Sequence, residues 1–273
     1  MPTYPQYSEI RLLFKEKKNK KNFVIINHAS KHAAKNTTSL HGGKRHQTLE
    51  QALHTTWPIH AQSFRTNTIN ENLRSLPKEH QFDLIVSIAN SNWILGGGFD
   101  DAISRTFCLP KHDYRSLTDA AQRKMYDQWR GFSPPGTYTI VTLPPELQAT
   151  NQRVCKYLAL CPTMRSPSAA NWNRDVVYES IWSLLCEVDR WNSNNTDDRL
   201  TRDGKINRIL MTPLATGTGG VSTERWAKQL VLALKHFSDA LENPQRWRNL
   251  EWAGLYHEVT EVERTWVGSW LFP

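Results

Sequence analysis

The chain has 273 residues, of which 39% are apolar, enough for one large domain or two small ones with a packed core. No stretch approaches the roughly 18 apolar residues that a membrane helix needs, and the amino-terminal residues show no apolar signal segment. The four cysteines have no C-x-x-C spacing, and two stand in apolar runs, as is typical of reduced, buried thiols. We therefore expect an intracellular protein, cytoplasmic or nuclear, with no membrane contact.

The net charge of +8 is concentrated in one segment. Residues 15–45 contain nine Lys or Arg and a single acid, Glu16, which accounts for all of it. The rest of the chain is therefore not a uniformly basic nucleic-acid binder. The lysines from Lys15 to Lys21 are compatible with a nucleic-acid contact. A solvated surface loop is favoured, because charge runs of this kind are common and unspecific.

Alternation of apolar strands and amphipathic helices begins near residue 82. We expect strands at 84–89, 137–143, 154–160 and 206–211, and helices at 102–107, 117–129, 175–191 and 223–237. This order predicts an α/β fold whose sheet is covered by helices on both faces. Upstream, the short β-type runs at 10–14 and 23–27 predict a hairpin.

The first strand of this region leads into a loop with three consecutive glycines. The segment Gly96-Gly97-Gly98-Phe99-Asp100 follows the strand and enters a helix. Glycines in a row cost backbone entropy, so their position needs a reason. One reason is the close approach of backbone N–H groups to an anion at a helix amino terminus. A plain tight turn is the alternative.

A second glycine-rich loop follows the last strand and again precedes a helix. It reads Ala215-Thr216-Gly217-Thr218-Gly219-Gly220. Ligands of α/β sheets bind beyond the carboxyl ends of the strands, where both loops are expected. The two loops together predict a site that holds a diphosphate from both sides.

These loops resemble those of a known family. Residues 85–103 closely resemble the macrodomain signature, in which Ile-Val-Asn-Ala-Ala-Asn-Ser precedes Leu-x-Gly-Gly-Gly-Gly-Val-Asp-x-Ala-Ile. The second loop resembles the family's Ser-Thr-Gly-x-Tyr/Phe-Gly phosphate loop, with Thr216, Gly217 and Gly220 in register. The resemblance spans roughly residues 82–240. It implies a macro-type three-layer α/β/α sandwich with a mixed, largely parallel central sheet.

The resemblance suggests a division of the chain into three parts. Residues 57–240 are expected to form the macro-like domain, preceded by a basic and polar extension over residues 1–56. The third part, residues 241–273, is rich in tryptophan, and we expect it to pack on the body through the side chains of Trp247, Trp252, Trp266 and Trp270.

The resemblance also implies a pose for ADP-ribose. The amides of Gly97, Gly98 and Phe99 meet one phosphate, and residues 216–220 meet the other. Asn90 bonds the distal ribose, and Asp100 lies beside it. A carboxylate in that place can bond a ribose hydroxyl, or orient or deprotonate a water. The alternative is that Asp100 caps the following helix. No metal or other cofactor is implied.

The chain departs from the family pattern at several positions. Ser87 replaces the first asparagine of Asn-x-x-Asn, and Ser104 replaces a histidine of some hydrolytic members. Gly219 stands where an aromatic residue usually covers the distal ribose. The upstream Gly-Asp-Ile segment, whose aspartate reads adenine, is absent.

Three functions remain open at this point. The leading hypothesis is a hydrolase that removes ADP-ribose from protein or processes ADP-ribose 1″-phosphate. The second is a non-catalytic reader of ADP-ribose, and the third is a nucleic-acid or chromatin adaptor that acts through the lysine segment. Two nearby side chains also have two interpretations each. Trp93 either stacks on a base or packs in the core, and Arg165 either reaches a phosphate or lies on the surface.

Overall fold

The computed structural model describes residues 22–26, 49–57, 65–69, 73–108, 113–151, 154–170, 172–194 and 204–266. The strands are β1 (Asn22–Ile26), β2 (Arg65–Ile69), β3 (Leu84–Ser87), β4 (Thr139–Thr142), β5 (Tyr157–Leu160) and β6 (Arg208–Met211). The helices are α3 (Gly98–Phe107), α4 (Ser116–Trp129), α5 (Pro145–Thr150), α6 (Val176–Asn194), α7 (Thr223–Glu242), α8 (Pro244–Arg248) and α9 (Trp252–Glu263). A further helix covers residues 49–56.

The strands form one sheet in the order β2-β1-β6-β3-β5-β4. Every neighbouring pair is parallel except β4 and β5, which are antiparallel. In the centre of the sheet, Ile85 of β3 pairs with Leu158 of β5 and Leu210 of β6. The mixed, largely parallel sheet is therefore confirmed.

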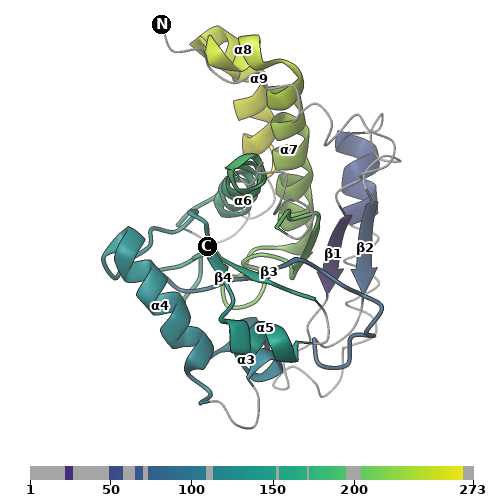
Figure 1. Ribbon diagram of the computed structural model, residues 1–273. Coiled ribbons are helices and arrows are strands. Elements are labelled where there is room, and N and C mark those ends of the chain that lie inside the picture. Colours follow the sequence, from purple (N-terminus) through teal and green to yellow (C-terminus); the bar gives the residue numbers. More distant parts are fainter. Residues whose placement is uncertain are drawn as a thin grey trace, which may run out of the picture.

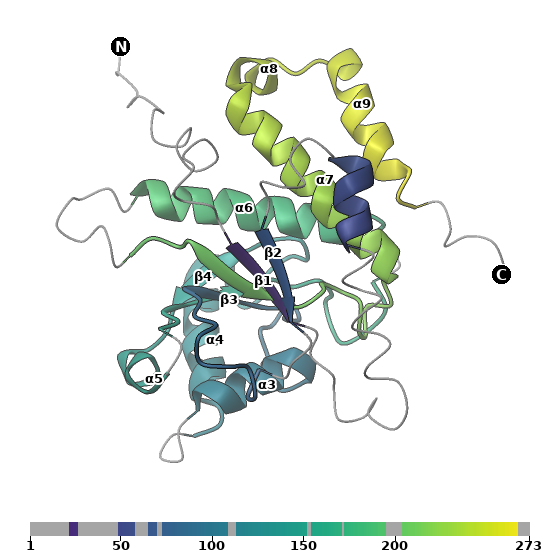
Figure 2. The same cartoon turned by 90° about the vertical axis from the view of Figure 1, so that its right-hand side faces the viewer.

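Alternating side chains of the inner strands pack into two separate hydrophobic cores, one on each face of the sheet. Val86, Ala159 and Met211 face the core that includes residues of α6 and α7. Their neighbours on the opposite face, such as Ile85 and Leu158, face the core that includes residues of α3, α4 and α5. Because successive side chains of a strand point to opposite faces, both faces must be apolar and covered. The result is a three-layer α/β/α sandwich, with α6 and α7 on one side of the sheet and α3, α4 and α5 on the other (Figures 1 and 2).

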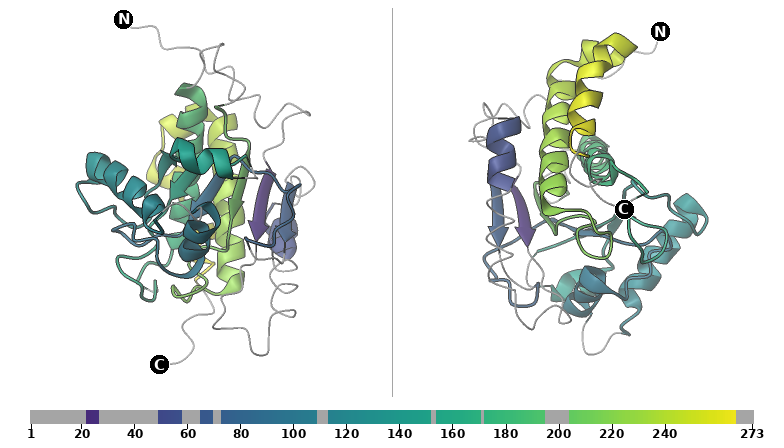
Figure 3. Two further views of the ribbon diagram at one scale, coloured as in Figure 1. Left: turned by 60° about the horizontal axis from the view of Figure 1, so that its bottom comes forward. Right: turned by 180° about the vertical axis from the view of Figure 1, so that it is seen from behind.

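The amino-terminal part of the sheet differs from expectation. β1 pairs in parallel with β2 on one edge and with β6 on the other. Both edges are thus occupied, which excludes the expected antiparallel hairpin with residues 10–14, a segment outside the described residues. The helix at 49–56 also buries Leu49, Ala52 and Leu53 in the core shared with α6 and α7. β1 and this helix therefore belong to the main body, and the proposed boundary at residue 57 is corrected (Figure 3).

The carboxyl-terminal part packs against the end of α7. The ring of Trp247 lies 5.4 Å from that of Trp182 in α6, measured between centroids. The indole N–H of Trp266 donates a 2.6 Å hydrogen bond to Asp175. Trp252, by contrast, is 88% exposed, so it does not pack on the body as expected. Trp270 lies outside the described residues. No helix in the described part of the chain has the length and apolarity needed to cross a membrane.

Candidate functional site

The two glycine-rich loops meet at one cavity of about 490 Å³. The loops follow β3 and β6, two neighbouring parallel strands, so their carboxyl ends lie at the same edge of the sheet. The structure brings ten of the expected site residues to this cavity: Asn90, Gly97, Gly98, Phe99, Asp100, Ala215, Thr216, Gly217, Thr218 and Gly219. Gly96 and Gly220, which were also expected there, do not line it.

The amino terminus of α3 forms one side of the cavity. Gly97 is the N-cap in an extended conformation, and no side chain caps the helix. Gly98 has a φ of +56°, a conformation that a residue with a Cβ rarely adopts. A Cβ added at Gly97 would meet no atom within 4 Å, so this backbone borders open space. Within the described part of the chain, the N–H groups of Gly97 and Gly98 have no acceptor. They are therefore free to bind an anion at the positive end of the helix.

The second loop folds around the carbonyl of Ala215, which has a φ of +56°. The N–H of Val221 donates to this carbonyl at 3.0 Å. Gly219 packs against the same residue so closely that a Cβ would lie 2.5 Å from the Ala215 oxygen. Glycine at 219 is thus a steric requirement of the loop, which explains why no aromatic residue occupies this position.

The loop presents a row of backbone donors. Among the described residues, no acceptor bonds the N–H groups of Thr216, Gly217, Thr218 and Gly219. Consecutive N–H groups of this kind form a concave anion site in many proteins. Two groups of donors, at α3 and in this loop, therefore border a single cavity.

Asp100 is the one ionisable residue that lines the cavity in the described part of the chain. It is the third residue of α3 and only 6% exposed. Its Oδ1 accepts a 2.7 Å hydrogen bond from the Ser87 hydroxyl, and the backbone N–H of Ile88 also bonds the carboxylate. The side chain thus points to the end of β3 and does not cap the helix. Burial raises the pKa of Asp100 to about 7, although both hydrogen bonds oppose that shift.

The side chain of Asn90 holds its own loop. Its Oδ1 accepts from the backbone N–H groups of Asn92 (3.0 Å) and Ile94 (3.4 Å), and its Nδ2 donates to the Ile94 carbonyl (3.0 Å). The amide still has a second N–H and lines the cavity. A ligand bond from Asn90 is therefore limited to one donor, and a change at this residue would also loosen the loop.

The other residues singled out in the sequence have structural roles. Ser104 is fully buried and donates to the Leu95 carbonyl at 2.9 Å, which ties α3 to the preceding loop. Trp93 is fully buried in the core under α3, so it packs and does not stack on a base. Arg165 is exposed and does not line the cavity. The lysines at 15–21 lie outside the described residues.

Six lining residues were not identified from the sequence: Ile88, Ile94, Met164, Pro167, Thr212 and Pro213. Thr212 and Pro213 directly follow β6, and Met164 follows β5. Asn90 forms a parallel bridge with Met164, which brings the segment after β5 beside the first loop. Four of these residues, Met164, Pro167, Thr212 and Pro213, lie beyond the carboxyl ends of β5 and β6. Ligands of α/β sheets bind there, so this position could have predicted them from the sequence. Ile88 and Ile94 are not predicted by the ends of these two strands.

No protein-family model matches the sequence, and no curated protein is similar to it. Some solved structures are similar to part of this chain. The macrodomain of Mycobacterium tuberculosis DarG is 17% identical, with a TM-score of 0.43 over 62% of this chain and 88% of its own. A macrodomain of Oceanobacillus iheyensis with MES bound is 15% identical, with a TM-score of 0.41 over 68% and 83%. The same macrodomain with ADP is 13% identical, with a TM-score of 0.32 over 58% and 85%.

All of these neighbours are macrodomains. At these identities and TM-scores the similarity carries no conclusion about the activity of this chain. Whatever the cavity binds must therefore be inferred from its own residues.

Proposed function

We propose that the cavity binds ADP-ribose. The observation that carries this proposal is the pair of backbone donor groups on the two loops, Gly97 and Gly98 in one and Thr216 to Gly219 in the other. Two adjacent phosphates need donors on both sides, and backbone N–H groups at a helix terminus and in a glycine loop suit them. No lysine or arginine lines the cavity among the described residues, so neutral donors must bind the anion.

The remaining walls fit the other parts of a dinucleotide-like ligand. Ile88, Met164 and Pro167 supply apolar surface for a planar base. Asp100 and Asn90 supply polar atoms for a ribose. The volume of about 490 Å³ falls within the range of roughly 300–1,000 Å³ that is usual for small-molecule sites.

We further propose that the protein hydrolyses an ADP-ribose derivative. Asp100 is the candidate general base. With a pKa of about 7 it is partly ionised at neutral pH, which suits proton transfer in both directions. In the proposed step, Asp100 takes a proton from a water that attacks the anomeric carbon of the distal ribose. The bond to the acceptor breaks, and the acceptor leaves with the bonding electrons. The acceptor is a protein side chain or phosphate.

The alternative is a reader that binds ADP-ribose without turnover. Two observations favour it. Ser104 is occupied by its bond to the Leu95 carbonyl, and the oxygen of Asn90 is occupied by the loop backbone. Both functions share the same ligand, so binding and chemistry must be tested separately.

Calorimetry of the full chain with ADP-ribose and with AMP tests the binding proposal. We expect tighter binding of ADP-ribose, because AMP cannot reach both donor groups. Equal affinities, or no binding of either at millimolar concentration, would reject the pose.

Turnover of an ADP-ribosylated protein then separates the hydrolase from the reader. Asp100→Ala should lower turnover by about 10²-fold or more, the usual loss for a general base, with a much smaller loss of affinity. Asn90→Ala should reduce both quantities together. If wild type and Asp100→Ala share one background rate while both bind ADP-ribose, the protein is a reader.

A further inference from the structure

One wall of the cavity carries a buried hydroxyl group without a partner. Thr212 lines the cavity directly after β6 and is only 6% exposed. Its Oγ1 makes no hydrogen bond to any described residue. Such a hydroxyl is destabilising, because it has lost its hydrogen bonds to water and gained none in return. Its place at the wall of a cavity is explained if a ligand supplies the missing bond.

The position of Thr212 distinguishes it from other buried groups that lack a partner. Thr163 also has a buried hydroxyl without a hydrogen bond, but this residue does not line the cavity. The unpartnered indole nitrogens of Trp93 and Trp226 belong to side chains of the two hydrophobic cores. Rotation about the Cα–Cβ bond of Thr212 can bring its hydroxyl to a ligand without movement of the backbone.

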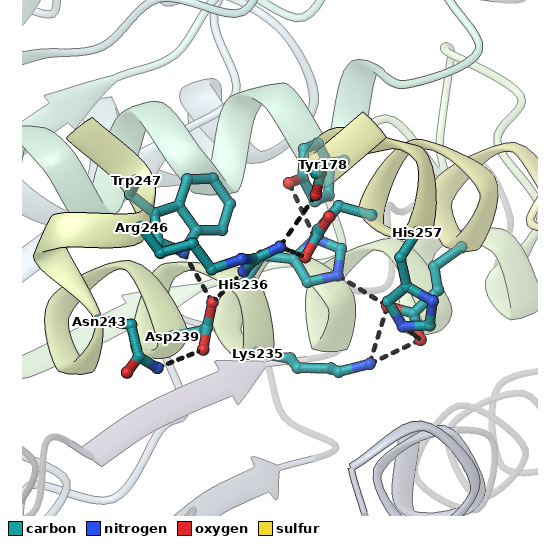
Figure 4. Close-up of polar contacts among 11 residues, drawn as sticks. Tyr178, Lys235, His236, Asp239, Asn243, Arg246, Trp247 and His257 are labelled. Atoms are coloured by element: carbon teal, nitrogen blue, oxygen red, sulfur yellow. Dashed lines mark hydrogen bonds and ion pairs between the residues drawn. The ribbon is translucent and has the colours of Figure 1, made fainter. Parts of the chain in front are cut away.

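A second cavity, of about 280 Å³, is lined by residues of α7, α8 and α9 and contains another unpartnered atom, Oε2 of Glu258. There, however, the charged side chains are paired with one another (Figure 4). The carboxylate of Glu261 accepts hydrogen bonds from Lys235 (2.6 Å) and His236 (2.8 Å). Arg246 binds the other oxygen of Glu258. These internal pairs account for the polar groups of the second cavity without a ligand.

The sheet places Thr212 beside the residue that holds Asp100. Ile85 of β3 pairs with Leu210 of β6 in a parallel register. Ser87 and Thr212 each follow two residues later, so they occupy neighbouring positions on the same face of the sheet. That face is covered by α3, and there the Ser87 hydroxyl donates to Asp100 at 2.7 Å. Thr212 is therefore on the Asp100 side of the cavity.

The chemistry of this side suits a sugar hydroxyl better than a phosphate. A threonine hydroxyl both donates and accepts hydrogen bonds, as a sugar hydroxyl does. Asp100 in its ionised form would repel a phosphate placed next to it, whereas an uncharged ribose would not be repelled. The backbone donors of the two loops are already available for the phosphates. Polar side chains on two adjacent strands can thus bond one ribose ring.

We propose that Thr212 determines the specificity of the cavity for a ribose beyond the diphosphate, by a hydrogen bond to one of the ribose hydroxyls. This inference rests on the proposed binding of ADP-ribose. It names the residue that distinguishes ADP-ribose from ADP, which ends at the second phosphate. A site built to bond a hydroxyl discriminates against a ligand that lacks it, because the buried partner is then left unpaired.

Calorimetry of the full chain with ADP-ribose and with ADP tests this proposal. Thr212→Val replaces the hydroxyl by a methyl group of similar size. It should lower the affinity for ADP-ribose by about tenfold, as expected for one lost hydrogen bond, and leave the affinity for ADP unchanged. Thr212→Ser keeps the hydroxyl and should keep the preference for ADP-ribose. Thr163→Val is the matched control, since it removes an unpartnered hydroxyl away from the cavity, and it should change neither affinity.

Thermal unfolding of the ligand-free proteins separates a role in binding from a role in the fold. Removal of an unpartnered hydroxyl should not lower the Tm of either valine variant. If Thr212→Val lowers the Tm but not the affinity for ADP-ribose, the hydroxyl serves the fold and the proposal is overturned.

The other outcomes of the calorimetry are equally decisive. Equal losses of affinity for ADP-ribose and ADP in Thr212→Val would place the bond at the phosphates or the adenosine, and would overturn the specificity for the ribose. Binding of ADP-ribose that Thr212→Val leaves unchanged overturns this inference alone. Failure of the wild-type protein to bind ADP-ribose rejects the proposed function and this inference together.

Discussion

The hydroxyl of Ser87 donates a 2.7 Å hydrogen bond to the carboxylate of Asp100, and neither side chain is more than 6% exposed. Ser87 is the last residue of β3, and Asp100 is in the first turn of α3, thirteen residues further along. The bond therefore connects the two ends of the first glycine-rich loop. It also fixes one oxygen of the only acid that lines the cavity in the described part of the chain.

The first prediction concerns this bond. Ser87→Ala should raise the pKa of Asp100 above its value of about 7, because the hydroxyl favours the ionised form. A hydrogen bond to a charged group contributes about 1.5–3 kcal/mol, equivalent to roughly one to two pKa units. Titration of the Asp100 carboxyl carbon by NMR measures the shift directly, and it does so whether or not the protein is an enzyme.

Ser104→Ala is the control for that change. Ser104 is as buried as Ser87 and lies in the same helix as Asp100. Its hydroxyl donates to the Leu95 carbonyl and not to Asp100. Its replacement should leave the Asp100 titration in place. If the two alanine variants shift the titration equally, the Ser87 bond has no specific effect on the carboxyl.

The second prediction is that Asp100 makes the protein less stable as the pH rises. The unfolded side chain loses its proton near pH 4, whereas the folded side chain keeps it until about pH 7. Between these values the folded state binds the extra proton, so the stabilising effect is fully present below pH 4 and is lost as the pH rises through 7. The loss amounts to roughly 4 kcal/mol for three pKa units.

Asp100→Asn should remove this dependence, since an amide does not titrate. Measured by thermal unfolding, the variant should match wild type near pH 4 and exceed it in Tm at pH 8. A constant difference between the two proteins across this range would mean that Asp100 is already ionised at low pH.

The central strands and both loops could be predicted because their signals are local. Residues 84–86 and 209–211 are short apolar runs, and each leads into a glycine-rich loop. The placement of β1 could not be predicted in this way. Its neighbours in the sheet are β2, some forty residues later, and β6, the last of the described strands along the chain. The sequence of a strand does not indicate which distant strands it pairs with in parallel. The lysines that precede β1 are typical of a turn, and they favoured a hairpin.

The side-chain roles at the site were less predictable than its location. Asn90 fits a ribose-binding position in the sequence, yet its amide bonds residues 92 and 94 of its own loop. From its position in the sequence Trp93 could stack on a base, but in the structure its φ is +50° and its side chain is fully buried in the core. Both outcomes depend on the conformation of the loop, which the order of residues does not specify.

The third prediction separates two glycines of the second loop. Gly219→Ala should destabilise the fold by about 1–3 kcal/mol, because its Cβ would lie 2.5 Å from the Ala215 oxygen and the loop must shift. Gly217→Ala should cost far less, since no atom lies within 4 Å of its Cβ. Chemical denaturation of both variants measures the contrast, and equal stability would show that the loop does not pack as described.

The last prediction tests the phosphate path without disturbing the fold. A side chain at Gly97 points into open space, so Gly97→Glu should unfold at nearly the wild-type temperature. Its carboxylate would enter the region that the donors of α3 border and repel a phosphate there, so ADP-ribose binding should be lost. Gly254→Glu is the matched control, because it adds the same charge at an equally open glycine in α9, far from the cavity. Calorimetry with ADP-ribose on all three proteins decides the matter. If folded Gly97→Glu keeps its affinity, the phosphates do not lie at the amino terminus of α3. If Gly254→Glu loses binding as well, the effect is one of net charge and not of position.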